Sequence, residues 1–116
     1  LAKKLGIDVA STAQSVINGY GSHGENLYEV IQTTQAYVGI QSPSSLAHRF
    51  CHEDTFGSLV GFATLAKELD VPTPGMDAII TCISMATGID YFTVGRTAQK
   101  VGLTGKSVEE IYEMIR

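Results

Sequence analysis

The sequence predicts an all-α fold, an irregular bundle of about six helices. Apolar residues recur at intervals of three and four in several segments, and residues that cap or end helices stand at the borders of those segments. No segment alternates polar and apolar residues for long enough to form a convincing strand. The chain has 116 residues, of which 44% are hydrophobic and 17% charged, so we expect residues 1–116 to form a single domain.

The N-terminal part of the chain predicts short helices followed by turns. Residues 1–6 contain two lysines and end in a glycine, as the last turn of a helix often does, so we expect the chain to begin inside an element and to be a fragment. Ser11 is expected to cap a helix that reaches Tyr20, and residues 26–32 predict another short helix. Residues 33–50 have little periodicity, which predicts an ordered loop.

The longest periodic segment, residues 54–69, predicts the main helix of the bundle. Gly57 and Gly61 lie four residues apart in it, so we expect another backbone to approach the helix closely there. Thr73 and Pro74 predict the start of the next helix, because a proline at the first helical position loses no hydrogen bond. The residues expected to face the core in these two helices include Leu59, Phe62, Ala63, Ala66, Leu69, Met76, Ile79, Ile80, Cys82 and Ile83.

The C-terminal part of the chain predicts three short elements. Asp90 is expected to cap a single turn, and residues 96–101 predict a brief helix that Gly102 ends. Ser107 and Glu110 have the spacing of a capping box, in which each side chain accepts a hydrogen bond from a backbone N–H at the start of a helix.

Two glycine patterns resemble nucleotide-binding motifs, but neither has the context that such a motif requires. Residues 19–24 match GxGxxG, yet a dinucleotide motif needs a strand before it and a helix directly after it. A helix is predicted before this pattern, so glycines that end the helix explain it better. The sequence Gly105-Lys106-Ser107 would belong to a phosphate loop only if a glycine stood where Lys100 stands.

Composition and charge exclude several classes of partner. The net charge is -4 and the sequence pI is about 5.2, so nothing attracts the chain broadly to nucleic acid or to anionic lipid. No apolar run approaches the length that crosses a bilayer. The two cysteines, Cys51 and Cys82, form no CxxC motif, and we expect a cytoplasmic protein with reduced thiols.

The densest polar cluster, residues 48–54, stands where the predicted loop meets the longest helix, and functional sites are often placed at such junctions. The plain structural interpretation is that Glu53 and Asp54 complement the helix N-terminus and that Arg49 pairs with one of them. Three residues of the cluster are potential metal ligands: His48, Cys51 and His52. A structural zinc site usually has four ligands in paired spacing, and a second pair is missing here, so no metal is expected.

Nine short segments carry a resemblance that runs through almost the whole chain. They are residues 24–29, 48–50, 53–54, 57–65, 71–74, 77–80, 88–91, 95–97 and 101–103. In this order and spacing they resemble the octopine/nopaline, or opine, dehydrogenase family. The resemblance implies the C-terminal helical domain of such an enzyme, with a fold like that of the C-terminal domain of 6-phosphogluconate dehydrogenase.

The resemblance also implies a reaction and a set of site residues. Enzymes of this family reductively condense the amino group of an amino acid with a 2-oxo acid such as pyruvate. They use NAD or NADP, held mainly by an N-terminal Rossmann domain that this chain lacks, and the substrates lie in the cleft between the domains. A histidine N-terminal to this chain acts as acid and base, and Asp54 stands where the family has the catalytic aspartate that orients it. Arg49 stands at the family's cleft arginine, and we expect it to bind substrate or cofactor together with His48.

The sequence is also compatible with other functions. A helical protein-interaction domain without a catalytic role is one alternative, and a small metal-binding regulator is another. The chain by itself is expected to be inactive, because it holds half of a site. We also expect Leu1, Leu5 and Ile7 to be exposed, and association into a homodimer to follow from such exposed apolar surface.

Overall fold

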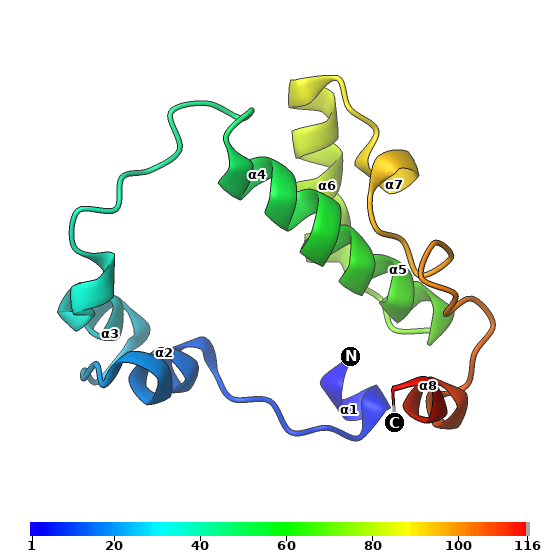
Figure 1. Ribbon diagram of the computed structural model, residues 1–116, viewed down its shortest axis with the longest axis horizontal. Helices are drawn as coiled ribbons and strands as arrows, with labels where there is room; N and C mark the ends of the chain where they lie inside the picture. Colours follow the sequence, from blue (N-terminus) through cyan, green and yellow to red (C-terminus); the bar gives the residue numbers. More distant parts are fainter. Residues whose placement is uncertain (116) are drawn as a thin grey trace. The chain divides into compact units, whose positions relative to one another are not determined.

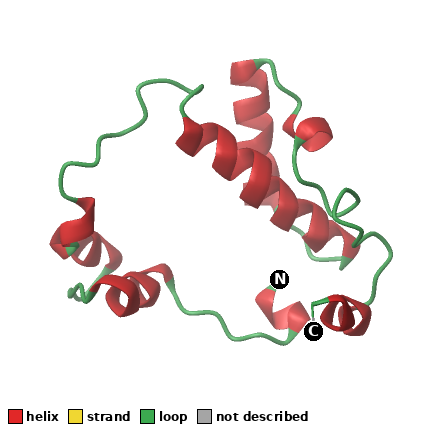
Figure 2. Ribbon diagram, in the orientation of Figure 1, coloured by secondary structure: helices red, strands yellow, loops and turns green. Residues whose placement is uncertain are grey.

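The computed structural model describes residues 1–115, and helices are the only regular elements in that range (Figure 1; Figure 2). This confirms the predicted all-α fold. The chain divides into two compact units. The N-terminal unit comprises Gly6–Ser42 with Ala2, and the C-terminal unit begins at Pro43 and includes Leu1 and Lys3–Leu5. A single domain over residues 1–116 stays a prediction.

The N-terminal unit consists of α2 (Thr12–Tyr20), α3 (Leu27–Thr33) and a 3-10 turn, η1 (Gln35–Tyr37). The Ser11 hydroxyl accepts a hydrogen bond from the Gln14 N–H at 3.1 Å, which confirms the predicted cap of α2. Val16 and Val30 are buried. Ser22 and Thr34 are buried as well, and their hydroxyls lie 2.6 Å apart, so the polar groups in this small core are paired.

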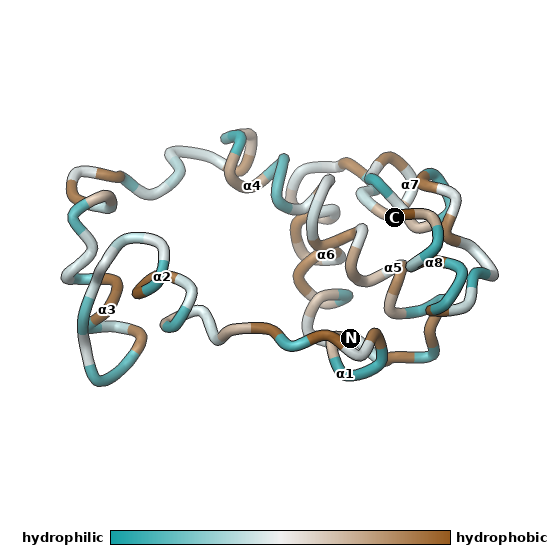
Figure 3. The backbone as a smooth tube through the Cα atoms, turned by 60° about the horizontal axis from the view of Figure 1, so that its bottom comes forward, coloured by the Kyte–Doolittle hydropathy of each residue, from teal (hydrophilic) through white to brown (hydrophobic). Residues whose placement is uncertain are grey.

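The C-terminal unit is built around two long helices. A helix runs without a break through α4 (Arg49–Glu53), a π-helical segment called η2 (Asp54–Leu59), and α5 (Val60–Glu68). The second long helix, α6 (Pro74–Thr87), packs against it, and α7 (Tyr91–Val94) follows. Figure 3 shows hydrophobic stretches along α5 and α6. The buried core comprises Val60, Ala63, Ile80 and Tyr91, with Phe56, Leu59, Met76, Ile83 and Ile89 packed around it.

The π-helical turn of η2 allows the segment after α7 to bind to the long helix. The Val60 N–H donates to the Thr55 carbonyl, five residues before it, rather than to the Phe56 carbonyl. The Phe56 carbonyl instead accepts a hydrogen bond from the Arg96 N–H at 2.9 Å. This contact fixes the chain beyond α7 against the segment that begins with Asp54.

Close backbone approach to this helix occurs at Gly95 rather than at Gly57. A Cβ atom on Gly95 would lie 2.5 Å from the Tyr91 carbonyl oxygen and 2.9 Å from Val60 Cγ1. A Cβ atom on Gly57 would meet nothing within 4 Å, so the prediction for Gly57 is wrong. Gly61 does face another backbone, since its Cβ would lie 3.4 Å from the Arg96 carbonyl oxygen, an ordinary contact distance.

Residues 96–101, predicted as a brief helix, form turns instead. The side chain of Lys100 donates to the carbonyls of Thr93, Val94 and Gly95 at 2.7, 2.9 and 3.1 Å. These bonds satisfy carbonyls at the end of α7, so the segment wraps around α7 rather than starting a helix. Gly102 has a φ of 77°, as expected of a residue that ends such a turn.

Several residues predicted to face the core are exposed. Phe62 is 53% exposed and Ile79 is 49% exposed, and Cys82 is exposed too. Helical periodicity identifies an apolar face but not which part of that face another element covers. Between these two helices the contacts are made by a narrower strip that includes Ala63, Ile80 and Ile83.

The C-terminal helix α8 (Val108–Met114) contacts the first helix, α1 (Ala2–Leu5). The Ser107–Glu110 capping box is present, and the Tyr112 hydroxyl donates to the Leu5 carbonyl at 2.7 Å. Leu1 and Leu5 are therefore half-buried rather than exposed, whereas Ile7 is exposed as predicted. In residues 1–115 no helix combines the length and the apolar character needed to span a bilayer.

Candidate functional site

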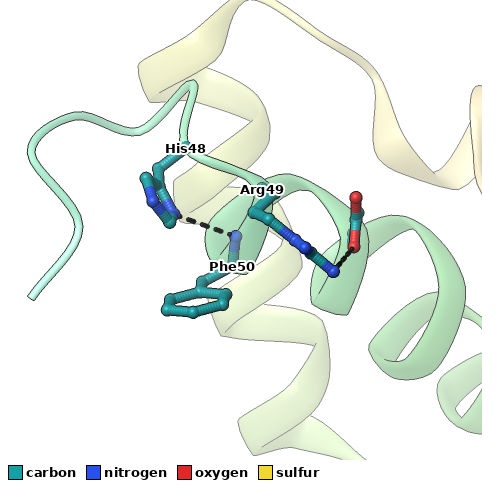
Figure 4. Close-up of polar contacts among 4 residues, drawn as sticks. His48, Arg49 and Phe50 are labelled. Carbon is teal, nitrogen blue, oxygen red and sulfur yellow. Dashed lines mark hydrogen bonds and ion pairs between the residues drawn. The ribbon is translucent and has the colours of Figure 1, made fainter. Parts of the chain in front are cut away.

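The polar cluster of residues 48–54 lies at the start of the long helix, as predicted. His48 occupies the N-cap position of α4, and its Nδ1 accepts a hydrogen bond from the Phe50 N–H at 3.2 Å (Figure 4). The His48 and Phe50 rings contact edge to face, with centroids 4.7 Å apart. His48 is half-buried and Phe50 is exposed. The hydrogen bond between them fixes the point at which the preceding loop joins the helix.

The guanidinium of Arg49 pairs with Glu53, not with Asp54. Arg49 Nη2 lies 3.2 Å from Glu53 Oε2, and the two side chains are 69% and 60% exposed (Figure 4). An exposed pair at this spacing contributes less than about 1 kcal/mol. Arg49 can therefore exchange Glu53 for another carboxylate at little cost, and a planar guanidinium binds carboxylates well.

Asp54 begins the π-helical segment η2 and is exposed. Its carboxylate has no hydrogen bond or ion pair within residues 1–115. π-Helical turns occur frequently at functional sites, and the first residue of this one is the residue that the sequence resemblance assigns to catalysis. The structure thus presents Arg49 and Asp54 on the surface at the start of one helix, available to groups outside the described chain.

His52 anchors the cluster to the core of the unit. Its Nδ1 lies 2.8 Å from the Tyr91 hydroxyl, and its ring stacks on Phe56 with centroids 5.9 Å apart. Tyr91 is completely buried, so this contact attaches the first turns of the long helix to α7. This pair could not be predicted from the sequence, because its members are 39 positions apart and no local pattern connects them.

Two of the three potential metal ligands in the cluster, His48 and His52, make structural contacts. His48 Nδ1 caps α4 and His52 Nδ1 binds Tyr91. Cys51 is half-buried and its thiol is free. Its backbone carbonyl accepts a hydrogen bond from the hydroxyl of the buried Thr55 at 2.7 Å. Within residues 1–115 no three histidine, cysteine or acidic side chains are arranged to hold a metal ion.

A mostly apolar cavity of about 510 Å³ adjoins the cluster. It lies between the residues just before His48, the first turns of the long helix, and the turn from α6 to α7. Its lining comprises Leu46, Ala47, His52, Ala86, Thr87, Ile89 and Tyr91. A concave surface with a few polar groups therefore lies next to the exposed charges of the cluster.

Residues 19–24 do not form a dinucleotide cradle. Gly19 lies inside α2, and Gly21 ends that helix in the left-handed conformation with a φ of 67°. Its N–H donates to the Ile17 carbonyl, as in a helix C-terminus. A Cβ atom on Gly24 would lie 2.6 Å from Glu29 Cβ, so this glycine allows the turn to pack against α3. The GxGxxG pattern is explained by helix ends, and it leaves no strand–turn–helix unit for NAD or NADP.

The fold and the cluster define an all-helical domain with an exposed charged site and no nucleotide cradle among its described residues. Residues 1–87 match the family model described as the NAD/NADP octopine/nopaline dehydrogenase alpha-helical domain. The chain belongs to this family, which confirms the resemblance seen in the sequence.

Similarity to curated proteins extends over most of the chain but over a minor part of each relative. The chain is 35% identical over 105 residues to an opine dehydrogenase of Arthrobacter sp. (strain 1C), covering 90% of this chain and 29% of that protein. It is 25% identical over 111 residues to Protein ocs of Agrobacterium tumefaciens (strain Ach5), covering 96% and 31%. It is also 25% identical over 96 residues to vitopine synthase of Allorhizobium ampelinum, covering 83% and 27%. The chain thus spans under a third of the length of these relatives.

Proposed function

We propose that this chain is the C-terminal helical domain of an NAD(P)-dependent opine dehydrogenase. The proposed reaction joins the amino group of an amino acid to the carbonyl carbon of a 2-oxo acid such as pyruvate, with loss of water and reduction of the resulting C=N bond. The observation that carries the proposal is the 35% identity to an opine dehydrogenase over nine-tenths of the chain. The exposed charges at the start of the long helix, Arg49 and Asp54, agree with a site that another domain completes.

Asp54 is proposed as a positioning residue for a histidine that lies outside this chain. An imidazole that exchanges a proton near neutral pH works better when a carboxylate fixes its tautomer and stabilises its charged form. Such a carboxylate has to be free of other partners. Asp54 has no partner within residues 1–115, and the packing of Arg96 and Gly95 against η2 fixes the backbone that carries it.

Arg49 and His48 are proposed to bind the substrates or the cofactor. Both substrates carry carboxylates, and the cofactor carries a pyrophosphate, so a permanently charged planar group is well suited to either. In this proposal a substrate carboxylate displaces Glu53 from Arg49. His48, which is fixed at the helix start by its bond to the Phe50 N–H, presents its Nε2 as a further hydrogen-bonding group.

The family is NAD/NADP-dependent, and residues 19–24 do not fit a dinucleotide. The proposal therefore assigns cofactor binding to a Rossmann domain outside this chain. The bound cofactor supplies the hydride. The helical domain supplies charge, orientation and closure of the cleft.

The test is an activity screen on the complete protein with NADH and NADPH. We expect oxidation of one reduced cofactor that requires both an amino acid and a 2-oxo acid, with a secondary amine as the product. Arg49→Ala is expected to raise the KM of the 2-oxo acid or of the cofactor, whereas Lys3→Ala, which removes an exposed cation elsewhere, serves as a control. A protein that oxidises neither cofactor with any such pair of substrates would contradict the proposal.

A further inference from the structure

A larger cavity, of about 830 Å³, lies at the other end of the long helix. It is formed where α5 ends and turns into α6, and α7 contributes Phe92 to its wall. Lys67, which also lines it, follows Asp54 by 13 residues, so the cavity lies roughly 20 Å along the helix from Asp54 at 1.5 Å per residue. This cavity is therefore separate from the His48–Asp54 cluster.

Three charged side chains of both signs line this cavity. Lys67 lies in the last turn of α5, Asp70 in the following turn, and Asp77 in the first turn of α6. None of the three has a hydrogen bond or ion pair through its side chain within residues 1–115. All three residues are exposed, as are Arg49 and Glu53, which do form an ion pair. The cavity thus collects one cation and two anions that the described chain leaves unmatched.

The backbone at Asp70 has the left-handed conformation, which residues other than glycine adopt infrequently. Asp70 has a φ of 55°, and it is the one non-glycine residue with a positive φ in the described chain. The Asp70 N–H donates to the Lys67 carbonyl and the Val71 N–H to the Ala66 carbonyl at 2.8 Å, the pattern of a helix end that glycine usually occupies. Glycine would relieve the strain. Unlike glycine, aspartate provides a carboxylate at this position. Residues with strained backbone conformations often belong to functional sites.

We propose that this cavity binds a free α-amino acid with an apolar side chain. A simple anion would meet two aspartates, and a simple cation would meet Lys67. A zwitterion satisfies both signs, with its ammonium at Asp70 and Asp77 and its carboxylate at Lys67. The apolar wall of Val71, Pro72 and Phe92 then covers the side chain. The cavity volume lies in the range of ordinary small-molecule sites. This site is distinct from the proposed active site and does not depend on its reaction.

The first test is calorimetry on the complete protein with three matched probes. L-leucine carries both charges, isopentylamine lacks the carboxylate, and 4-methylpentanoate lacks the ammonium. We expect L-leucine to bind and each analogue to bind at least about tenfold more weakly, since each loses a charge-assisted hydrogen bond. Equal binding of the three probes, or no binding of L-leucine, would overturn the proposal.

Variants then separate this cavity from the His48–Asp54 cluster. Lys67→Met and Asp70→Asn should each weaken L-leucine binding at least about tenfold. Asparagine tolerates the left-handed conformation, so the second variant changes the charge with little change in backbone. Asp8→Asn, at an exposed aspartate of the N-terminal unit, should leave this binding unchanged. L-leucine binding that is kept in both Lys67→Met and Asp70→Asn would overturn the proposal, because the amino acid would then be held at another site.

Discussion

Replacing Gly95 with alanine tests the packing that fixes η2, the segment that begins with Asp54. Gly95 has a φ of -64° and a ψ of 173°, an extended conformation that alanine adopts without strain. Its added Cβ would lie 2.5 Å from the Tyr91 carbonyl oxygen, 2.9 Å from Val60 Cγ1 and 3.1 Å from the Phe56 carbonyl oxygen. Two of these neighbours are backbone atoms and the third is on a completely buried side chain. Overpacking of this kind costs typically about 1–3 kcal/mol.

Gly57→Ala is the matched control, because Gly57 lies in η2 and its Cβ would meet nothing within 4 Å. Alanine is the better helix former, so this variant should be more stable than the parent by roughly 0.5–1 kcal/mol. Urea denaturation followed by circular dichroism measures both free energies of unfolding. Equal stability of the two variants would refute the close approach at Gly95. A destabilised Gly57→Ala would show that something also covers this face of η2.

Three further changes test individual contacts. Tyr91→Phe removes the hydroxyl that binds His52 and should lower the free energy of unfolding by about 0.5–1.5 kcal/mol; no change in a urea titration would mean that the bond adds nothing to stability. The hydrogen bond from the Ser107 N–H lowers the pKa of Glu110 in the folded state, so this carboxylate stabilises the fold above its unfolded pKa, and that contribution is lost as the pH falls. Glu110→Gln should therefore destabilise the protein at neutral pH and not near pH 3, and an equal effect in both thermal melts would contradict this. Asp70→Gly should stabilise the fold by roughly 0.5–1 kcal/mol because it relieves the positive φ, and a loss of stability would show that the carboxylate itself supports the turn.

Signals that depend on neighbouring residues in the chain predicted the structure well. Ser11 caps α2, Ser107 and Glu110 form their capping box, and Gly88 ends α6 with a φ of 71°. Each of these contacts forms within about one helical turn, so the sequence alone contains the information. Asp90 likewise caps α7 through the Thr93 N–H.

Features that depend on tertiary contacts could not be predicted in this way. Residues 96–101 have helical spacing, but Lys100 reaches back to α7 and the Arg96 N–H is held by the Phe56 carbonyl, so tertiary bonds decide the local structure. The packing of residues 95 and 96 against Phe56 also distinguishes Gly95, which has close neighbours, from Gly57, which has none within 4 Å of its Cβ position. Cys82 stands among isoleucines in the sequence, yet no described element covers its side of α6.

The candidate site shows the same division. The sequence located residues 48–54 through their density of charge and their place at a loop–helix junction. It did not show that Arg49 forms its ion pair with Glu53, or that His52 makes a hydrogen bond with Tyr91. It also did not show that Asp54 is the first residue of a π-helical segment. These features arise from helix geometry and from a contact between distant segments, and they decide which carboxylate of the acidic pair is free.

The most direct test compares the turnover numbers of Asp54→Asn and Glu53→Gln in the complete protein. The two carboxylates are adjacent and both exposed, but Glu53 pairs with Arg49 while Asp54 has no partner within residues 1–115. With saturating cofactor, amino acid and 2-oxo acid, Asp54→Asn should lower kcat by roughly a hundredfold or more, the scale of a disabled acid–base step. Glu53→Gln should keep kcat within a few-fold of the parent. Near-normal turnover in Asp54→Asn, or an equal loss in both variants, would contradict the role assigned to Asp54.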